Sequence, residues 1–205
     1  MRPGEAMFSP KGLVFLCLLF FASCGHKKKG KSVDPVIDQN KIFETNTGFQ
    51  FKFPMEGDWY HESFEEGRYN VGQKVLKDGH KSSAVVSHGN LYTPDGKPAT
   101  DQQFLEGLKN AFFSNLQSTN EGKDKINFID KKFKGADCFF YENEIKQMQP
   151  LGLMKIANDG IVCMHPSRPA HFIWMLLTER TPVKKEYTFS IEDKNKFWNT
   201  LEFLK

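Results

Sequence analysis

The sequence predicts an α+β fold with a single antiparallel β-sheet and two main helices packed on it. Short runs of alternating or continuous apolar residues follow one another with tight turns between them, which is typical of antiparallel strands. Only two segments repeat apolar residues at the three- and four-residue spacing of a helix. Because one face of such a sheet can accept the apolar stripes of both helices, a layered arrangement follows.

The first strands are predicted soon after residue 40. Residues 49–53 have the sequence Phe-Gln-Phe-Lys-Phe, in which an aromatic ring occupies every second position. This period of two describes a strand with one buried face. Residues 68–92 contain further strand-like runs, and the Asp78-Gly79 pair between them is a hairpin-turn signal.

Further strands are predicted after residue 125. They cover residues 126–133, 136–145, 153–156, 161–164 and 171–178. Residues 172–177 are apolar on both faces, which predicts a central strand. The sequence Ala157-Asn158-Asp159-Gly160 predicts a turn that separates two of these strands.

Each helix is predicted from a capping signal followed by an apolar stripe. Thr100 and Gln103 form a capping box before the first helix, and Ser190 with Asp193 forms a similar signal before the second. The stripe of the first helix consists of Phe104, Leu105, Leu108, Ala111, Phe112 and Leu116. The stripe of the second consists of Phe197, Trp198, Leu201 and Leu204.

The N-terminal region has the pattern of an export signal. Ten apolar residues, Leu13–Ala22, follow Lys11, whereas a helix that spans a bilayer needs about 20. The sequence Phe21-Ala22-Ser23-Cys24 resembles the lipobox of bacterial lipoproteins, in which the Cys is diacylated and becomes the mature N-terminus. An ordinary signal peptide that is cut after Ala22 or Ser23 is the alternative.

The lipobox resemblance implies three parts: a lipoprotein signal peptide at 1–23, a Lys- and Gly-rich tether at 24–40 and one domain at 41–205. It implies that Cys24 carries the lipid and anchors the protein in a bacterial cell envelope. Each buried CH₂ contributes about 0.8 kcal/mol, so two or more chains anchor a protein stably. In such lipoproteins an Asp after the Cys favours the inner membrane. Gly25 stands here, which favours the outer membrane with the domain facing the periplasm.

The charge distribution argues against nucleic-acid binding. The chain has a formal net charge of +3, and Lys27, Lys28, Lys29 and Lys31 all lie in the tether. The domain that follows is close to neutral, whereas a nucleic-acid partner needs a basic face. Lysines beside a lipid anchor are attracted to anionic lipid by about 1 kcal/mol each. A solvated, flexible tether is the alternative interpretation.

The order of the predicted elements resembles PsbP, the extrinsic photosystem protein, and its bacterial relatives. The similar features are Gly48–Pro54 followed by Trp59, a mid-chain helix, a strand that begins with Phe133-Lys134-Gly135-Ala136, a late apolar strand and a closing helix with Phe and Trp. The resemblance spans most of residues 42–205. It implies the PsbP-like α+β layout and a non-enzymatic accessory, assembly or binding role. No binding residue can be carried over, and no photosynthetic role is implied.

Two cysteines remain in the domain, Cys138 and Cys163. Exported proteins keep their disulfides, and a regular hairpin centred between Pro150 and Leu151 would place these two cysteines opposite each other. A turn at residues 157–160 would change that register. The sequence is therefore compatible with a disulfide between Cys138 and Cys163 and with two buried free thiols.

The sequence contains no established metal or catalytic motif. Cys163 and His165 share one face of a predicted strand and are weak candidate metal ligands. A structural zinc site needs four ligands, however, and no Cys-x-x-Cys or His-Glu-x-x-His spacing is present. A Gly-x-Ser-x-Gly elbow, a phosphate-binding loop and a dinucleotide fingerprint are also missing. We therefore expect no cofactor.

Two functional hypotheses follow. The first is a membrane-anchored, non-catalytic envelope lipoprotein that acts as a binding or assembly accessory module. Its partners would be the membrane, through the N-terminal lipid, and an envelope protein or a small ligand. The alternative is a metal-dependent or hydrolytic envelope enzyme that uses His61, His165 or His171.

Overall fold

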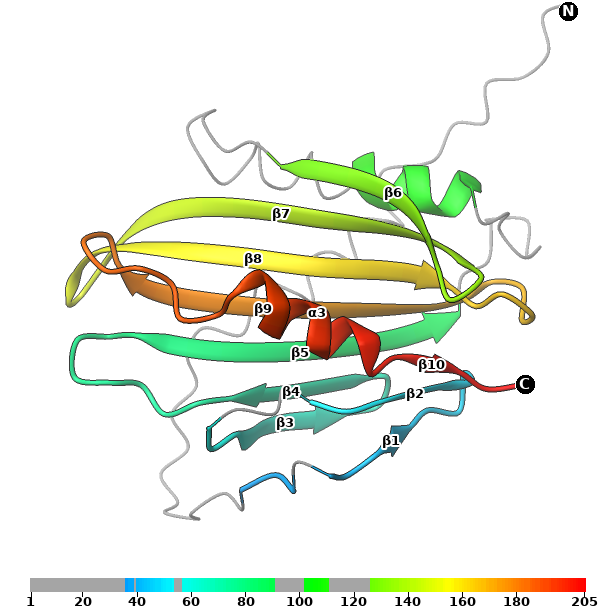
Figure 1. Ribbon diagram of the computed structural model, residues 1–205, viewed down its shortest axis with the longest axis horizontal. Helices are drawn as coiled ribbons and strands as arrows, with labels where there is room; N and C mark the ends of the chain where they lie inside the picture. The colour runs from blue at the N-terminus through cyan, green and yellow to red at the C-terminus, as the bar shows by residue number, and fades with distance from the viewer. Residues whose placement is uncertain (1–35, 39, 54–56, 91–101, 111–125) are drawn as a thin grey trace, which may run out of the picture.

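The computed structural model of the protein describes residues 36–38, 40–53, 57–90, 102–110 and 126–205. A seven-stranded antiparallel sheet in the order β3-β4-β5-β9-β8-β7-β6 forms its centre (Figure 1). The strands are β3 (Tyr60–Glu65), β4 (Arg68–Gly72), β5 (Lys81–Asn90), β6 (Asn127–Phe133), β7 (Ala136–Gln149), β8 (Gly152–Met164) and β9 (His171–Pro182). The predicted central strand is confirmed, because β9 lies between β5 and β8 in the middle of the sheet.

A second, three-stranded antiparallel sheet packs on one face of the large sheet. β1 (Phe43–Glu44) and β10 (Glu202–Phe203) flank β2 (Phe49–Phe51), so the C-terminal segment pairs with the N-terminal hairpin. Phe49, Phe51 and Phe53 are at most 3% exposed, whereas the residues between them are partly exposed. The predicted period-two pattern is therefore confirmed, although this strand belongs to the small sheet.

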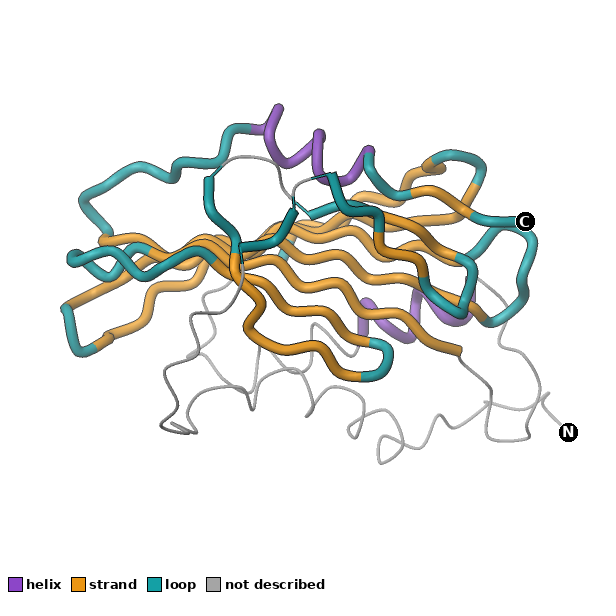
Figure 2. The backbone as a smooth tube through the Cα atoms, turned by 90° about the horizontal axis from the view of Figure 1, so that it is seen from below, coloured by secondary structure: helices purple, strands orange, loops and turns teal. Residues whose placement is uncertain are grey.

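The two described helices lie on opposite faces of the large sheet (Figure 2). α3 (Ile191–Asn199) shares its face with the small sheet, and Phe197 and Trp198 join the same core as Phe49 and Phe51. The helix at residues 102–110 covers the other face. Its side chains Phe104, Leu105 and Leu108 pack with a second core that includes Phe139, Val162 and Trp174. Successive residues of one strand are buried in different cores because their side chains point to opposite faces of the sheet.

The predicted fold class is wrong. The described residues are mostly β, with two antiparallel sheets instead of one, and two small helices that do not share a face. The small sheet was not predicted because two of its strands have only two residues, too few to show a period. Its pairing is also non-local, since β2 near the N-terminus joins β10 at the C-terminus. Both faces of the large sheet are apolar, so each face needs its own cover.

The predicted turn at residues 157–160 is also wrong. β8 runs without a break from Gly152 to Met164, with β7 on one side and β9 on the other. Gly160 is the cross-strand partner of Tyr141, and a Cβ atom at residue 160 would overlap the Tyr141 ring. The glycine therefore gives space to an aromatic ring on the neighbouring strand instead of forming a turn.

The helix boundaries differ from the prediction at the C-terminus. The N-cap at Ser190 is confirmed, with reciprocal hydrogen bonds between Ser190 and Asp193. α3 ends at Asn199, however, and Leu201 is buried beyond it, because Glu202 and Phe203 pair with β2. The predicted cap of the first helix at Thr100 and its residues after 110 lie outside the described residues.

Candidate functional site

A cleft of about 320 Å³ lies between α3 and the strands β6, β7 and β8. In Figure 1, α3 stands in front of the middle of the large sheet, and β7 and β6 lie beside it in the direction of the sheet edge. The cleft is lined by Asn127, Ile129, Lys131, Phe140, Tyr141, Glu142, Asp159, Gly160, Ile191, Lys194, Asn195 and Trp198. We call this site the α3 cleft.

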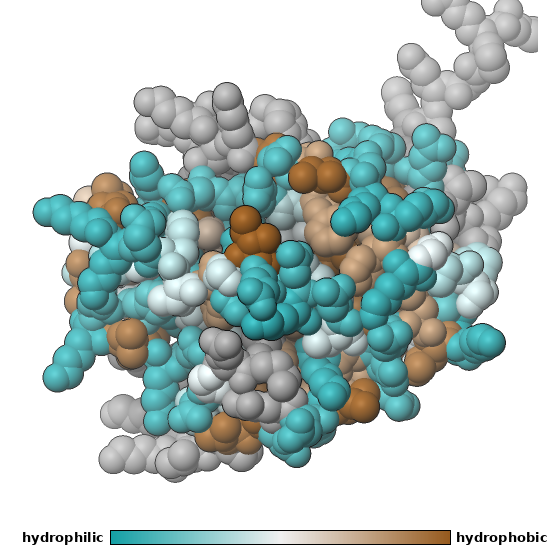
Figure 3. Space-filling view, in the orientation of Figure 1, coloured by the Kyte–Doolittle hydropathy of each residue, from teal (hydrophilic) through white to brown (hydrophobic). Residues whose placement is uncertain are grey.

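The apolar part of the α3 cleft combines a buried floor with an exposed rim. Phe140 on β7 and Trp198 on α3 contribute aromatic surface. Ile129 and Ile191 lie at the rim and are 53% and 77% exposed. Figure 3 shows apolar side chains among hydrophilic ones on this side of the molecule, in the area above α3. Exposed apolar side chains beside a concave surface are typical of a binding site.

The charged part of the α3 cleft connects the helix to the sheet. Asp159 Oδ2 on β8 lies 2.8 Å from Lys194 Nζ on α3, and both side chains are mostly buried. Burial raises the pKa of Asp159, the Lys194 ammonium opposes this rise, and the nearby carboxylate of Glu142 adds to it. Glu142 is close because it lies opposite Asp159 in the β7–β8 register. The cleft therefore offers both signs of charge around an apolar floor.

A buried carboxylate on β9 fixes the segment that leads into α3. Glu179 is 4% exposed, and it accepts hydrogen bonds from the Thr188 N–H at 2.6 Å, the Thr188 hydroxyl at 2.9 Å and the Phe189 N–H at 3.1 Å. His80 Nε2 lies 3.4 Å from the same carboxylate. Thr188 and Phe189 directly precede the N-cap Ser190, so the position of α3, which forms the cleft wall, depends on Glu179.

The histidines named for the enzyme hypothesis have other partners. His165 is buried, its Nε2–H donates to the carbonyls of Gly48 and Leu204, each at 3.0 Å, and its Nδ1 accepts from the Ser167 N–H at 3.2 Å. His171 Nδ1 donates to the Thr47 carbonyl at 3.1 Å. In the described part of the chain, no group of three or more His, Cys, Asp or Glu side chains is arranged to hold a metal ion.

His61 lies apart from the other two histidines of that hypothesis. It belongs to the edge strand β3, and β4 and β5 separate this strand from β9, which begins at His171. Cys163, the other weak candidate ligand, faces Cys138. The structure therefore brings His165 and His171 together at the β1–β2 turn and leaves His61 apart from them.

Three histidines instead fasten the β1–β2 turn to the large sheet. His88 on β5 has its Nδ1 at 2.8 Å from the Thr47 hydroxyl. His165 and His171 contact the backbone carbonyls of Gly48 and Thr47 in the same turn. The sequence shows these residues as isolated histidines, because their common target lies more than 40 positions away from each of them.

This arrangement predicts a loss of stability in mild acid. Burial lowers the pKa of His88 and of His165 below the ordinary value of 6.5. The unfolded chain then binds more protons than the folded chain, so the stability that is present above pH 6.5 decreases as the pH falls through 6.5 towards the folded pKa values. Thermal unfolding between about pH 7.5 and about pH 5 should show this decrease, and the variant His88→Gln/His165→Gln should show a flatter profile. Parallel profiles would contradict the assignment.

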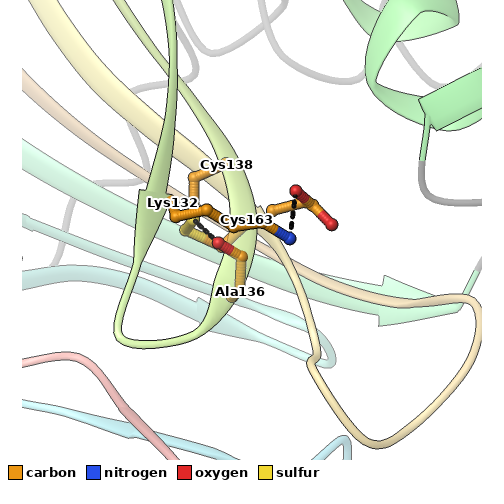
Figure 4. Close-up of a disulfide and its surroundings, with 5 residues drawn as sticks. Lys132, Ala136, Cys138 and Cys163 are labelled. Atoms are coloured by element: carbon orange, nitrogen blue, oxygen red, sulfur yellow. Dashed lines mark hydrogen bonds and ion pairs between the residues drawn. A yellow bond between two sulfur atoms is a disulfide. The ribbon is translucent and has the colours of Figure 1, made fainter.

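Cys138 and Cys163 are cross-strand partners, and their sulfur atoms lie 2.07 Å apart (Figure 4). The uninterrupted β8 strand allows this register, in which the hairpin centre lies between Pro150 and Leu151. Both side chains are buried in the core beneath the small sheet. The disulfide joins β7 to β8 at the end of the hairpin that is opposite its turn.

Removal of this cross-link should destabilise the protein. The two cysteines are 25 residues apart, and closing a loop of this length corresponds to about 3.5 kcal/mol in the chain-entropy model. We expect Cys138→Ala/Cys163→Ala, and reduction of the wild type, to lower the free energy of unfolding in urea by about that amount. Two reactive thiols from these residues in an Ellman titration of the unfolded, unreduced protein would contradict the bond.

Comparison with known proteins adds no family assignment. No protein-family model and no curated protein matches this chain. Cys24 and the apolar run before it lie outside the described residues. Among the residues that the structure does describe, no helix is long and apolar enough to cross a bilayer. The lipid anchor and the likeness to PsbP therefore continue as proposals.

The α3 cleft was not predicted from the sequence. Its helical wall had a detectable signal, because Ile191, Lys194, Asn195 and Trp198 repeat at three- and four-residue steps and share one face of α3. Its floor had none, because Asp159 was assigned to a turn. The residues of β7 and β8 that line the floor are brought together by a register that spans the whole β7–β8 hairpin.

Proposed function

We propose that the protein is a membrane-anchored, non-catalytic envelope lipoprotein that acts as a binding or assembly accessory module through the α3 cleft. A lipid on Cys24 would hold the domain at the membrane. The observation that carries the binding role is the pair of exposed isoleucines, Ile129 and Ile191, beside the aromatic surface of Phe140 and Trp198. The likeness to PsbP points in the same direction.

The chemistry of the α3 cleft favours binding over catalysis. Its charged side chains are Lys131, Glu142, Asp159 and Lys194, and Asp159 is already paired with Lys194 in a bond that holds the helix. A general base needs a reacting proton within hydrogen-bond reach and a suitable pKa. Here the pair connects two structural elements, and the histidines serve the β1–β2 turn.

The occupant of the α3 cleft should be amphipathic. The space of about 320 Å³ corresponds to a few side chains, and residues of β6 line one side of it. Apolar groups would contact Ile129, Phe140 and Ile191, while charged groups would meet Lys131 and Glu142 at its border. A short segment of an envelope protein partner has this combination of groups.

Affinity capture from cross-linked envelopes tests the binding role. The variant Ile129→Arg/Ile191→Arg places charge on the rim without changing a buried residue, and Ile42→Arg is the control because Ile42 is 51% exposed on another part of the surface. Loss of rim contacts worth roughly 2 kcal/mol lowers the yield of a specific partner by about thirtyfold. Equal yields from all three proteins would contradict a binding role for the cleft.

Two further measurements test the other parts of the proposal. Radiolabelled palmitate should enter the wild type but not Cys24→Ala, and failure to label the wild type would contradict the lipid anchor.

Metal analysis of the purified protein separates the proposal from a metal-dependent enzyme. Stoichiometric zinc or copper would contradict the non-catalytic role.

A further inference from the structure

One end of the large sheet carries exposed apolar side chains on two neighbouring loops. At the turn between β7 and β8, Met148, Leu151 and Leu153 are 72%, 63% and 43% exposed. In the loop between β4 and β5, Val75 and Leu76 are 53% and 57% exposed. The two loops touch, because a Cβ atom at Gly79 would lie 3.0 Å from Leu151 Cδ1. We call these five residues the hairpin-end surface.

Lysines surround the hairpin-end surface. Residues 73–80, 144–155 and 179–187 contain seven Lys or Arg against four Asp or Glu. Some of these charges are paired, as in the contact of 2.5 Å between Lys185 Nζ and Asp78. Lys74, Lys77, Lys146 and Lys184 are exposed. Figure 3 shows brown and teal surface side by side at this end, on the left. Apolar side chains within a cationic border are suited to the surface of an anionic bilayer.

The chain enters the described domain at the same end of the sheet. Val36 forms a bridge with Tyr60, the first residue of β3. Tyr60 lies in register with Gly72, and this row continues through Ser83 and Thr178 to Asn158, beyond which the β7–β8 hairpin projects. The tether from Cys24 to residue 35 has 12 residues, which reach at most roughly 40 Å when fully extended. A lipid on Cys24 would therefore allow this end of the sheet to reach the bilayer surface.

We propose that the hairpin-end surface docks on an anionic bilayer surface, with Met148, Leu151 and Leu153 in the headgroup region and the lysines against lipid phosphates. This inference rests on the proposed lipid anchor. The strands of the large sheet then rise from the membrane, and the α3 cleft, which lies on a face of the sheet away from the hairpin turn, stays open to a partner.

Environment-sensitive labels on the full, lipidated chain test this orientation. An NBD fluorophore is attached at Met148→Cys, and a matched label is attached at Glu66→Cys in the β3–β4 turn, which lies at the other end of the sheet. Each protein is reconstituted into vesicles of phosphatidylcholine alone or with phosphatidylglycerol. We expect a blue shift and protection from aqueous iodide at residue 148 on the anionic vesicles, and a water-like spectrum at residue 66 on both.

Charge-reversal variants and flotation distinguish the outcomes. Lys74→Glu/Lys146→Glu should abolish the blue shift at residue 148, whereas Lys132→Glu, near the other end, should not. A protein that floats with the vesicles but keeps a water-like spectrum at residue 148 overturns the docking and leaves the anchor. A protein that does not float overturns both. A blue shift that ignores phosphatidylglycerol and grows with protein density indicates contact between copies, which also overturns the docking.

Discussion

Replacement of Glu179 by Ala should destabilise the protein by roughly 3–5 kcal/mol, because removal of one partner from a buried charged network leaves the others unsatisfied. Two backbone N–H groups, the Thr188 hydroxyl and His80 would lose their acceptor. The segment before Ser190 would be released, and α3 with it. Urea unfolding measures the loss, and a shift of the Trp198 emission to longer wavelength would report the exposure of the α3 cleft.

Two control variants define the effect of Glu179. Glu179→Gln keeps the shape and one acceptor, so it should cost less than the Ala variant. Glu186→Ala removes an acidic side chain from the same connecting segment, where it is 98% exposed, and should change stability by no more than about 0.5 kcal/mol. A similar loss for Glu179→Ala and Glu186→Ala would show that the buried network does not hold α3.

Replacement of Gly160 by Ala should cost roughly 3 kcal/mol, from overpacking together with a lost buried hydrogen bond. The added methyl group would overlap the Tyr141 ring, which is 6% exposed in the second core. To make room, the ring must move away from Trp174, whose Nε1–H donates to the Tyr141 hydroxyl at 2.7 Å. Thermal unfolding should show the decrease.

A second glycine provides the matched control for Gly160. Nothing lies within 4 Å of a Cβ atom built at Gly107, which belongs to the helix at residues 102–110. Gly107→Ala should therefore stabilise the protein by up to about 1 kcal/mol, the opposite sign. Tyr141→Ala removes the overlapping ring, and in that background Gly160→Ala should lose most of its cost. An unchanged cost would contradict the close contact between the two residues.

The sequence predicted the strands of the large sheet better than it predicted contacts between residues far apart in the chain. Residues 172–177 are apolar at every position, and this pattern indicates a strand with two buried faces wherever it stands. The pairing of β2 with β10 depends on contacts between the two ends of the chain, which no local pattern records. Gly160 shows the same limit, because Asn-Asp-Gly is a turn signal until Tyr141 is known to lie across from it.

The candidate site was only partly accessible from the sequence. The capping box at Ser190 placed the start of α3 correctly, and the face with Ile191, Lys194 and Trp198 could have been identified from its spacing. That Asp159 meets Lys194 follows from the position of α3 over the sheet. Glu179, a charged residue in a strand, gave no sign that it would be buried and would fix that position.

Site-specific photo-cross-linking tests the proposed role of the α3 cleft most directly. A benzophenone amino acid in place of Ile129 is activated in intact cells, and the same amino acid in place of Ile42, an equally exposed residue directly before β1, is the control. We expect a discrete adduct, visible by gel or intact mass, from residue 129 and not from residue 42, and its loss in the Ile191→Arg background. No adduct from residue 129, or the same adducts from both positions, would show that the α3 cleft does not bind a partner.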